Sequence, residues 1–229
     1  MHAELRQRVL GANFELSTMG LAHASFGNVS EVDRDAAVVA IKPSGVPYAQ
    51  LRPEDVAVVA LDDGRHLAGL LPSSDTPTHL ELYRTFARIG GVAHTHSTYA
   101  TSWAQARRAI PCLGTTHADY VNGPVPCTRV LTDDECRDEY ERVTGLAVID
   151  ALQGLDPGEV PAVLVASHGA FTWGASAAQA VEHAAALEEI AHVAFNTVLL
   201  DASVEPIGNA LLTRHFCRKH GPTAYYGQR

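Results

Sequence analysis

Several features that define other classes of protein are scarce in this chain of 229 residues. Its four cysteines, at positions 112, 127, 136 and 217, include no C-x-x-C pair, so reduced thiols are expected rather than a disulfide framework. Positive charge is also scarce, because 17 Lys and Arg stand against 26 Asp and Glu. The basic residues are scattered, which argues against a nucleic-acid or anionic-membrane partner.

Long apolar runs are absent too, since those present are strand-length and far short of the roughly 20 residues of a membrane helix. The N-terminus, Met1-His2-Ala3-Glu4, has neither the basic nor the apolar region of a signal peptide, so we expect a cytoplasmic protein. A chain of this length can bury a full core without metal or disulfide, and any metal is therefore expected to be catalytic.

Short β-branched runs alternate irregularly with amphipathic stretches. Apolar spacing predicts helices, and capping sequences predict further helix starts near 98 and 133. No linker, charge block or repeat interrupts the pattern, so residues 1–229 are expected to form a single domain. We predict α/β layering in which a central, mostly antiparallel sheet is sandwiched between helical layers. The predicted helices cover about 3–20, 76–88, 177–201 and 208–220, and the predicted strands 38–41, 56–61, 91–96 and 160–167.

A doubly wound parallel sheet is the alternative fold. It is disfavoured because no two glycines lie two residues apart, which excludes the dinucleotide-binding pattern G-x-G-x-x-G. No Walker loop is present either. We therefore expect no NAD cofactor.

Histidine is unusually frequent, with 12 residues. His94 and His96 flank Thr95 at the end of a predicted strand, and the two-residue period of a strand sends both imidazoles to one face. His168 ends a second apolar run. With Asp75 nearby, these side chains could form a three- or four-ligand site for Zn²⁺ or a similar divalent cation. Paired strand histidines are also common as polar edge residues, so the pattern alone leaves the metal open.

Three segments could hold a phosphate: 27–30 (Gly-Asn-Val-Ser), 42–45 (Lys-Pro-Ser-Gly) and 72–75 (Pro-Ser-Ser-Asp). They offer hydroxyls, a lysine and backbone N–H groups, which are the donors that an anion needs. For any single segment, ordinary turn chemistry is the favoured explanation. Only their convergence in space would favour a phosphate site.

Two other segments carry titratable groups. Residues 115–120 read as a loop in which Asp119 could be a helix cap or an acid/base group. Tyr225 and Tyr226 would ordinarily form a frayed tail. A tail folded against a neighbouring subunit could instead supply a phenol as a general acid. The residues alone do not choose between these interpretations.

Seven motifs follow one another along the chain: G-N-V-S at 27–30, I-K-P-S-G-V at 41–46, P-S-S-D-T-P-T-H at 72–79, H-T-H-S at 94–97, G-T-T-H-A-D-Y at 114–120, S-H-G at 167–169 and H-G-P-T-A-Y-Y-G-Q at 220–228. Taken together, these motifs resemble the class II aldolase/adducin family. Asp75, Asp119 and the tyrosine tail favour the sugar-phosphate epimerases of that family over its aldolases, in which glutamate is typical after the two serines.

The resemblance implies a role for each group of residues. Asp119 and Tyr226 would be the catalytic acid/base pair, with Tyr226 supplied by the adjacent subunit of a homotetramer. Thr98-Tyr99 departs from the Arg-His pair expected after H-T-H-S, which puts the surroundings of the metal in question. The implied metal ligands are His94, His96 and His168, with Asp75 beside or on the metal; the implied phosphate pocket is Gly27, Asn28, Lys42, Ser44, Gly45, Ser73 and Ser74; and Thr115, Glu141 and His215 would lie near the site.

The activity implied is zinc-dependent inversion of C4 in a pentulose phosphate. It would proceed by retro-aldol cleavage of C3–C4, rotation of the aldehyde and re-addition. The alternatives are a sugar-phosphate aldolase or dehydratase on the same scaffold, and a non-catalytic adducin-like interaction domain. From the residues alone, a zinc hydrolase is a further alternative, although the chain lacks H-E-x-x-H.

Overall fold

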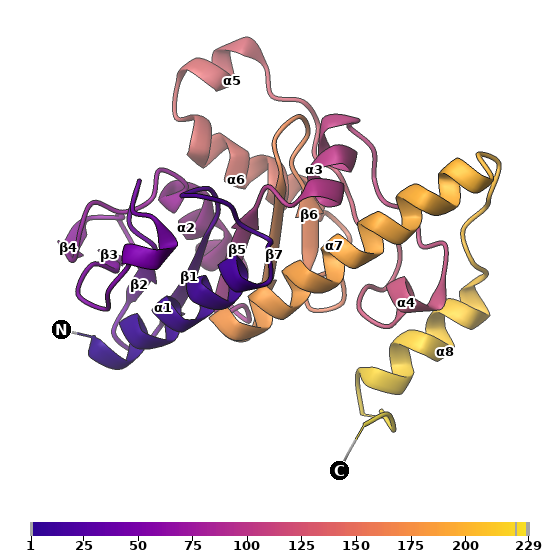
Figure 1. Cartoon of the computed structure of the whole chain (residues 1–229), viewed down its shortest axis with the longest axis horizontal. Helices are drawn as coiled ribbons and strands as arrows, with labels where there is room; N and C mark the ends of the chain where they lie inside the picture. Colours follow the sequence, from indigo (N-terminus) through magenta and orange to yellow (C-terminus); the bar gives the residue numbers. More distant parts are fainter. Residues whose placement is uncertain (1, 223, 228–229) are drawn as a thin grey trace.

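The structure is a computed structural model that describes residues 2–222 and 224–227. Met1, Thr223, Gln228 and Arg229, which belong to the predicted domain or its C-terminal motif, lie outside the described residues. Within the described part, eight α-helices, one short 3-10 helix (Tyr48–Gln50) and seven strands follow one another along the chain (Figure 1).

All seven strands form one sheet, in the order β4-β3-β2-β1-β5-β7-β6. Every pair of neighbouring strands is antiparallel, which confirms the predicted sheet and not the doubly wound alternative. The strands are β1 (Asn28–Asp33), β2 (Val38–Ile41), β3 (Ala57–Ala60), β4 (His66–Ala68), β5 (Gly91–Thr95), β6 (Ala162–Leu164) and β7 (Ala170–Gly174).

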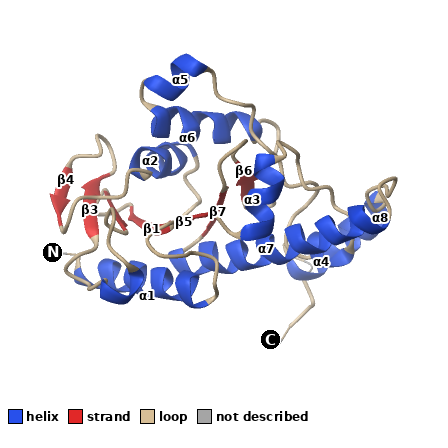
Figure 2. Cartoon of the chain, turned by 45° about the horizontal axis from the view of Figure 1, so that its top comes forward, coloured by secondary structure: helices blue, strands red, loops and turns tan. Residues whose placement is uncertain are grey.

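Helices cover both faces of this sheet, as Figure 2 shows. On one face lie α1 (Ala3–Thr18) and α7 (Ala177–Leu200), and on the other α2 (Thr76–Thr85) and α6 (Tyr140–Ala151). Because both faces are covered, every residue of β2 and β3 is buried. The remaining helices are α3 (Thr98–Gln105), which packs on α7, α5 (Asp133–Arg137), which precedes α6, and α4 (Thr115–Ala118) and α8 (Asn209–Lys219), which pack on each other away from the sheet (Figure 1).

The central strand β5 shows how the sheet orients the candidate site. Successive side chains point to opposite faces, so Val92 packs in the cluster that contains Leu82 of α2, whereas Ala93 packs in the cluster that contains Leu16 of α1. His94 shares the face of Val92. The strand therefore directs its histidine toward the layer formed by α2 and α6.

Strand β1 was not predicted, because its sequence mixes polar and apolar residues without a clean alternation. The structure shows that its polar side chains have distant partners. Glu31 accepts hydrogen bonds from the Nε of Arg8 at 2.6 Å and the backbone N–H of Ala177 at 2.9 Å. Long-range pairing thus makes a central strand out of a segment that reads as a turn.

The predicted strand 160–167 is too long. Strand β6 ends at Leu164, and a tight turn follows in which Val165 N–H donates to the carbonyl of Gly169 and Ser167 adopts φ 64°. His168 consequently lies in the β6–β7 connection and not at a strand end. This turn lets β7, which was not predicted, pair with both β6 and β5.

Helix capping was predicted correctly in part. The Thr132–Glu135 capping box is present, but the helix it starts breaks at Glu139 (φ 52°), so α6 begins anew at Tyr140. The cap residue of α2 is Asp75 and not Thr76. Its carboxylate does not cap the helix, because it accepts instead from the side-chain amide of Asn28 at 2.7 Å.

None of the described helices is long and apolar enough to cross a membrane.

Candidate functional site

Three histidines converge at one end of the sheet. His94 belongs to β5, His96 follows that strand directly, and His168 comes from the β6–β7 turn. Their ring centroids lie 4.8–4.9 Å apart, and their potential ligand nitrogens all lie within 4.8 Å of one another. The Nε2 atoms of His94 and His96 are 3.1 Å apart. Such a cluster matches the three-histidine ligand set of a divalent metal.

Second contacts orient two of these rings. His94 Nδ1 lies 3.0 Å from the carbonyl oxygen of Ala170, and a hydrogen bond there requires the proton on Nδ1. This tautomer leaves a free lone pair on Nε2, as metal ligands require. The Tyr140 hydroxyl contacts His168 Nδ1 at 3.3 Å, which makes Nε2 of that ring the expected ligand nitrogen.

Two of the histidines, His96 and His168, have lowered pKa values. Burial lowers the pKa of His96, and burial together with His94 and His96 lowers the pKa of His168 to about 4. At neutral pH these two imidazoles therefore offer lone pairs to a cation.

Asp75 lies beside this cluster. Burial raises its pKa, but electrostatic interaction with His94 and His79 and the hydrogen bond from Asn28 outweigh burial, so the pKa of Asp75 is lowered overall. The carboxylate is therefore ionised at neutral pH. Its oxygens are not among the ligand atoms that lie within 4.8 Å of one another, which are those of the three histidines.

The three predicted phosphate segments do converge. Pro43 and Pro72 form a β-bridge that brings two of the segments together, and β1 places the third beside them. A cavity of about 440 Å³ results. It is lined by all seven predicted phosphate residues, Gly27, Asn28, Lys42, Ser44, Gly45, Ser73 and Ser74, and by Asp75, Glu141 and the three histidines.

Two features shape the wall of this cavity. Gly27 adopts φ 77°, and a Cβ there would lie 2.9 Å from the carbonyl oxygen of His94, so only glycine fits. Lys42 is buried, and burial lowers its pKa. Its ammonium donates to the carbonyl of Ser25 at 3.3 Å and lies 4.9 Å from the ring centroid of Tyr48. Lys42 thus fixes the loop before β1.

The predicted acid/base residues lie elsewhere in the same chain, where α4 and α8 pack together (Figure 1). Asp119 accepts hydrogen bonds from His215 Nδ1 at 3.0 Å and from the guanidinium of Arg218. Burial raises the pKa of Asp119, but Arg218, His215 and Lys219 lower it by more than burial raises it. The pKa is therefore lowered overall, and the carboxylate is ionised. The ring of Tyr226 lies over Arg218, with 4.8 Å from the guanidinium carbon to the ring centroid.

The candidate residues therefore form two groups. Glu141, at the start of α6, lines the cavity that contains His94, His96 and His168, which we call the histidine cavity. Asp119, His215 and Tyr226 do not line it. Thr115 belongs with the second group, because its carbonyl accepts the backbone N–H of Asp119 at 3.0 Å.

Tyr140 and Phe26 are among the cavity residues that the sequence did not reveal. Tyr140 was missed because a single helix from 133 would have placed it on a solvated face, and only the break at Glu139 turns it toward His168. Phe26 is 64% exposed and lies 6.3 Å from the ring of His96 between centroids. A large exposed aromatic next to G-N-V-S was the available signal.

The departure at Thr98-Tyr99 has a structural role. The Tyr99 ring stacks on His192 of α7, with centroids 3.9 Å apart and planes 13° apart. Its backbone N–H donates to the carboxylate of Glu188 at 2.8 Å. Tyr99 therefore joins α3 to α7.

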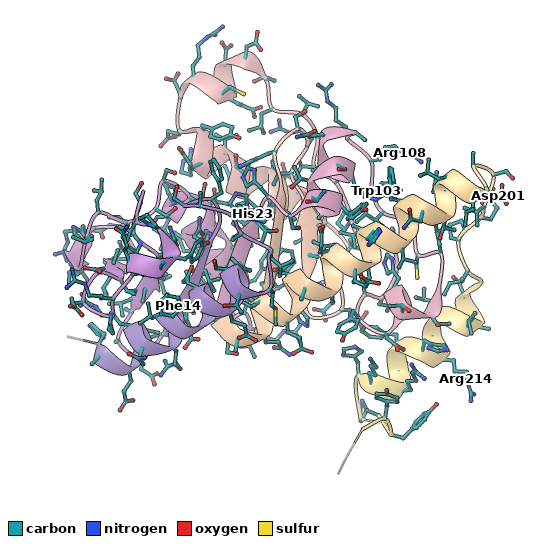
Figure 3. The ribbon with its side chains drawn as sticks, in the orientation of Figure 1. Phe14, His23, Trp103, Arg108, Asp201 and Arg214 are labelled. Atoms are coloured by element: carbon teal, nitrogen blue, oxygen red, sulfur yellow. The ribbon has the colours of Figure 1, made fainter. Side chains whose placement is uncertain are left out.

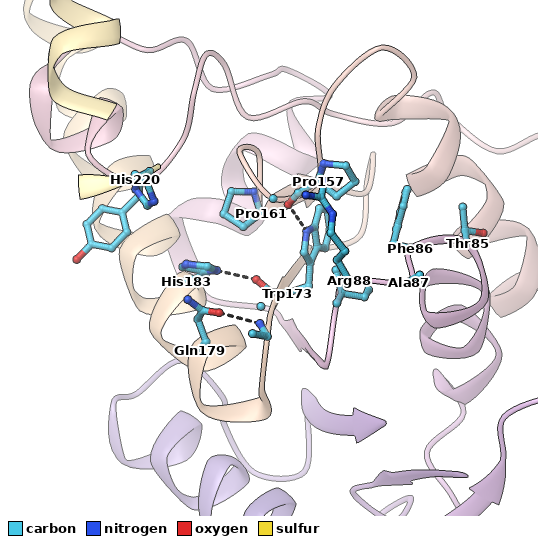
Figure 4. Close-up of a pocket in the computed structure, with 15 residues that line it drawn as sticks. Thr85, Phe86, Ala87, Arg88, Pro157, Pro161, Trp173, Gln179, His183 and His220 are labelled. Atoms are coloured by element: carbon cyan, nitrogen blue, oxygen red, sulfur yellow. Dashed lines mark hydrogen bonds between the residues drawn. The ribbon is translucent and has the colours of Figure 1, made fainter. Parts of the chain in front are cut away.

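A second cavity of about 440 Å³ lies at the other end of β7 (Figure 4). Three of its polar side chains are engaged by the backbone or by a neighbouring carboxylate: His183 donates to the carbonyl of Trp173, Gln179 accepts from Ala175 N–H, and Arg88 pairs with Asp156. The histidine cavity is the better candidate because its nitrogen ligands converge on one point.

Comparisons with known proteins agree with this geometry. The sequence model of the Class II Aldolase and Adducin N-terminal domain matches residues 7–195. The chain is 47% identical over 226 residues to a protein named L-ribulose-5-phosphate 4-epimerase UlaF from Salmonella paratyphi C (strain RKS4594), covering 99% of both chains. It is 48% identical over 227 residues to the protein of the same name from Salmonella typhi, again covering 99% of both. Among solved structures, an L-fuculose 1-phosphate aldolase shares the fold with a TM-score of 0.82 and 23% identity, over 94% of this chain and 95% of that one.

Proposed function

The chain belongs to the class II aldolase and adducin family, and from that premise we propose that it is an L-ribulose-5-phosphate 4-epimerase. It would interconvert L-ribulose 5-phosphate and D-xylulose 5-phosphate. The observation that carries the proposal is the convergence of three histidines and three phosphate-type segments on one cavity. Relatives of 47% and 48% identity over 99% of their length bear that enzyme's name.

The donor set fits zinc. The imidazoles of His94, His96 and His168 would hold the ion, and the carbonyl of Ala170 fixes the tautomer of His94. Three histidines leave a position open for substrate oxygens, as in catalytic rather than structural zinc sites. When bound, the ion supplies a Lewis acid that stabilises negative charge developing on substrate oxygens.

Inversion at C4 of the substrate requires one of the bonds to C4 to be broken and remade. The C4–H is not acidic, and the sequence lacks the glycine-rich loop that would bind NAD for transient oxidation. The remaining route to inversion is cleavage of the C3–C4 bond. Loss of the C4 hydroxyl proton leaves glycolaldehyde phosphate, and the electron pair of the broken bond passes to the enediolate of dihydroxyacetone.

The phosphate pocket would retain the aldehyde between cleavage and re-addition. Phosphate sits on C5, so donors from Asn28, Ser44 and Ser73 would hold that end while the carbonyl turns about C4–C5. Re-addition to the opposite face gives the other epimer. Retention of the aldehyde therefore distinguishes an epimerase from an aldolase.

The proton on the C4 oxygen must be handled on both sides of the aldehyde. We assign this to Asp119 and Tyr226. Neither residue lines the histidine cavity of its own chain, so a neighbouring copy of the chain would supply them, in a homotetramer. The exposed apolar residues at the end of α7 support such an assembly: Val193 and Phe195 are 47% and 40% exposed, and Leu199 and Leu200 are 69% and 89% exposed.

Two further features belong to this proposal. Residues 1–229 would act as one domain, because α8 is tied to α4 through Asp119 and Arg218. A cytoplasmic location fits the substrate, since a doubly charged sugar phosphate does not cross a bilayer unaided.

A class II sugar-phosphate aldolase is the second candidate, favoured by the fold shared with the L-fuculose 1-phosphate aldolase. A non-catalytic adducin-like domain is the third, and the convergence of three imidazoles speaks against it.

One incubation separates these functions. Zinc-loaded protein is mixed with L-ribulose 5-phosphate, and D-xylulose 5-phosphate, glycolaldehyde phosphate and dihydroxyacetone are measured together, beside a chelated sample. Metal-dependent D-xylulose 5-phosphate is the expected result. Free glycolaldehyde phosphate and dihydroxyacetone without the epimer would indicate an aldolase, and no turnover with any metal would favour the interaction domain.

A further inference from the structure

We propose that Arg218 is a positioning residue that joins Asp119 and Tyr226 into one preassembled acid/base unit. The inference rests on the proposed function, in which these two side chains handle the C4 proton. Asp119 follows α4, and Tyr226 lies in the C-terminal tail, 107 residues later by their numbering. Arg218, in the last turn of α8, contacts both.

The first contact fixes the carboxylate. The Nε of Arg218 donates to one oxygen of Asp119 at 3.0 Å, and its Nη2 donates to the other oxygen. This two-point pairing sets the plane of the carboxylate as well as its position, which a single point charge cannot do. The side chains of both residues are largely buried, at 25% and 11% exposure, so solvent screens the pair only partly.

The second contact fixes the backbone of the tail. The carbonyl oxygen of Arg218 accepts the N–H groups of Tyr225 at 2.9 Å and Tyr226 at 3.0 Å. The last carbonyls of a helix lack partners within the helix and are free to accept such bonds. Gly221, with φ 82°, turns the chain back so that the tail can reach them. The tail is therefore held at the helix end that also carries the guanidinium.

The third contact fixes the ring. The guanidinium carbon of Arg218 lies 4.8 Å from the centroid of the Tyr226 ring, within cation–π range. Tyr226 is 61% exposed, so this contact holds the ring while leaving it open to a partner surface. One residue thus constrains the carboxylate, the tail backbone and the phenol ring.

The charge of Arg218 alone does not explain this arrangement. Lys219 and His215 also contact Asp119, at 3.4 Å and 3.0 Å. When Arg218 is changed, Asp119 keeps the Lys219 ammonium and the hydrogen bond to His215 Nδ1, so its ionisation does not depend on Arg218 alone. What no neighbour replaces is the planar fork that bonds Asp119 at two points beneath the Tyr226 ring.

The test uses Arg218→Lys, which keeps the positive charge and the backbone carbonyl but loses the fork. Arg214→Gln is the matched control, because Arg214 is an exposed residue one turn earlier on α8 (Figure 3). We expect Arg218→Lys to lower kcat by roughly 10- to 10²-fold while KM and zinc content change less than about twofold. The control should behave as the parent.

A double-variant cycle separates positioning from general stability. Because Arg218 acts through Tyr226 and Asp119, Arg218→Lys should add little to the loss caused by Tyr226→Phe or by Asp119→Asn. The proposal would be overturned if the losses in kcat multiplied in full in both double variants. It would also be overturned if kcat of Arg218→Lys equalled that of Arg214→Gln.

A measurement that does not depend on turnover tests the role of Arg218 separately from the proposed function. Amide hydrogen exchange at Tyr225 and Tyr226 should be faster in Arg218→Lys than in the parent and in Arg214→Gln. Because the backbone carbonyl is retained in Arg218→Lys, unchanged exchange would contradict a role of the guanidinium in holding the tail. If the parent shows no epimerisation at all, the proposed function fails, whereas the exchange result still decides whether Arg218 holds the tail.

Discussion

Glu188 of α7 caps the N-terminus of α3 by accepting a hydrogen bond from the backbone N–H of Tyr99, which lies 89 residues earlier in the chain. Its carboxylate oxygens accept the backbone N–H groups of Tyr99 at 2.8 Å and Ala100 at 3.0 Å. Ser97, the residue at the cap position, makes no side-chain cap bond. Since α3 starts two residues after His96, this carboxylate also holds the segment that carries one of the three histidines.

Replacing Glu188 by Gln should therefore affect both stability and metal binding. The amide keeps one acceptor but points an NH₂ group at an N–H donor, so we expect a loss of about 1–2 kcal/mol in the free energy of unfolding. We also expect zinc affinity to fall roughly tenfold, as for other groups that orient ligands. Urea unfolding of metal-free protein and chelator competition measure the two effects. Glu189→Gln, on the exposed side of the same helix, is the control; equal zinc affinity in both variants would contradict the expectation.

Gly27→Ala tests the cavity wall. A side chain at φ 77° is strained, and its Cβ would lie 2.9 Å from the carbonyl oxygen of His94. We expect stability to fall by about 1–3 kcal/mol and KM for the sugar phosphate to rise, because the loop must move into the cavity to relieve the clash. Gly11→Ala is the control: Gly11 lies in α1 with open space around its Cβ, and this change should stabilise by roughly 0.5–1 kcal/mol. A Gly27→Ala protein with unchanged melting and KM would refute this account of the wall.

Much of this site could be predicted from local sequence. The H-x-H pattern on a strand places His94 and His96 together because side chains alternate. The three glycine- and serine-rich segments contain the seven residues that the family resemblance implies for the phosphate pocket, and all seven line the cavity. His168 could not be placed this way. Its position depends on the turn at Ser167 (φ 64°), and that turn is stabilised by packing of β7 against β5, which a local pattern does not encode.

The separation of Asp119 and Tyr226 from the histidine cavity was equally invisible in the sequence. Both belong to motifs that resemble the family as strongly as the histidine motif does, yet they are held at the α4–α8 contact by Arg218. A motif gives the type of residue that the chemistry needs. The distance between motifs follows from how α7 carries α8 away from the sheet (Figure 1).

Buried histidines should make the metal-free protein sensitive to acid. Burial lowers the pKa of His79 to about 3 and, with the neighbouring histidines, that of His168 to about 4. In the unfolded chain both titrate near 6.5, so between about pH 6.5 and 4 the unfolded state binds more protons than the folded state. The free energy of unfolding should therefore fall as the pH decreases through this range.

Substitution of His79 tests the origin of that slope. His79 Nδ1 bonds Ser30 Oγ at 2.7 Å, and its Nε2 is buried without a hydrogen-bond partner in the described part of the chain. His79→Gln removes the titrating group and should flatten part of the decline, as measured by urea unfolding at pH 7 and pH 5. His23→Gln, at an exposed position, should leave the slope unchanged. An identical slope in parent and His79→Gln would assign the acid sensitivity elsewhere.

Asp119→Asn tests the proposed proton transfer. The carboxylate is ionised in the folded protein, since Arg218, His215 and Lys219 hold its pKa below the ordinary value despite burial. An amide cannot exchange a proton at neutral pH, so turnover should fall by at least about 10²-fold with zinc still bound. The variant should also lose part of the pH dependence of stability. Stabilisation from Asp119 is complete above its unfolded pKa near 3.9 and disappears as the pH falls through the lower folded pKa.

The same variant distinguishes a chemical role from a structural one. If Asp119 only anchored α8, Asp119→Asn would lower the melting temperature and loosen the tail but leave kcat per folded, zinc-loaded protein close to that of the parent. If it moves the C4 proton, kcat falls although circular dichroism and zinc content are preserved.

Mixing Asp119→Asn chains with chains whose cavity is disabled by His94→Asn tests whether Asp119 acts in its own chain or in a neighbouring one. Each single variant is expected to be inactive. Partial recovery of activity in mixed assemblies would follow only if one chain's Asp119 serves its neighbour's histidine cavity.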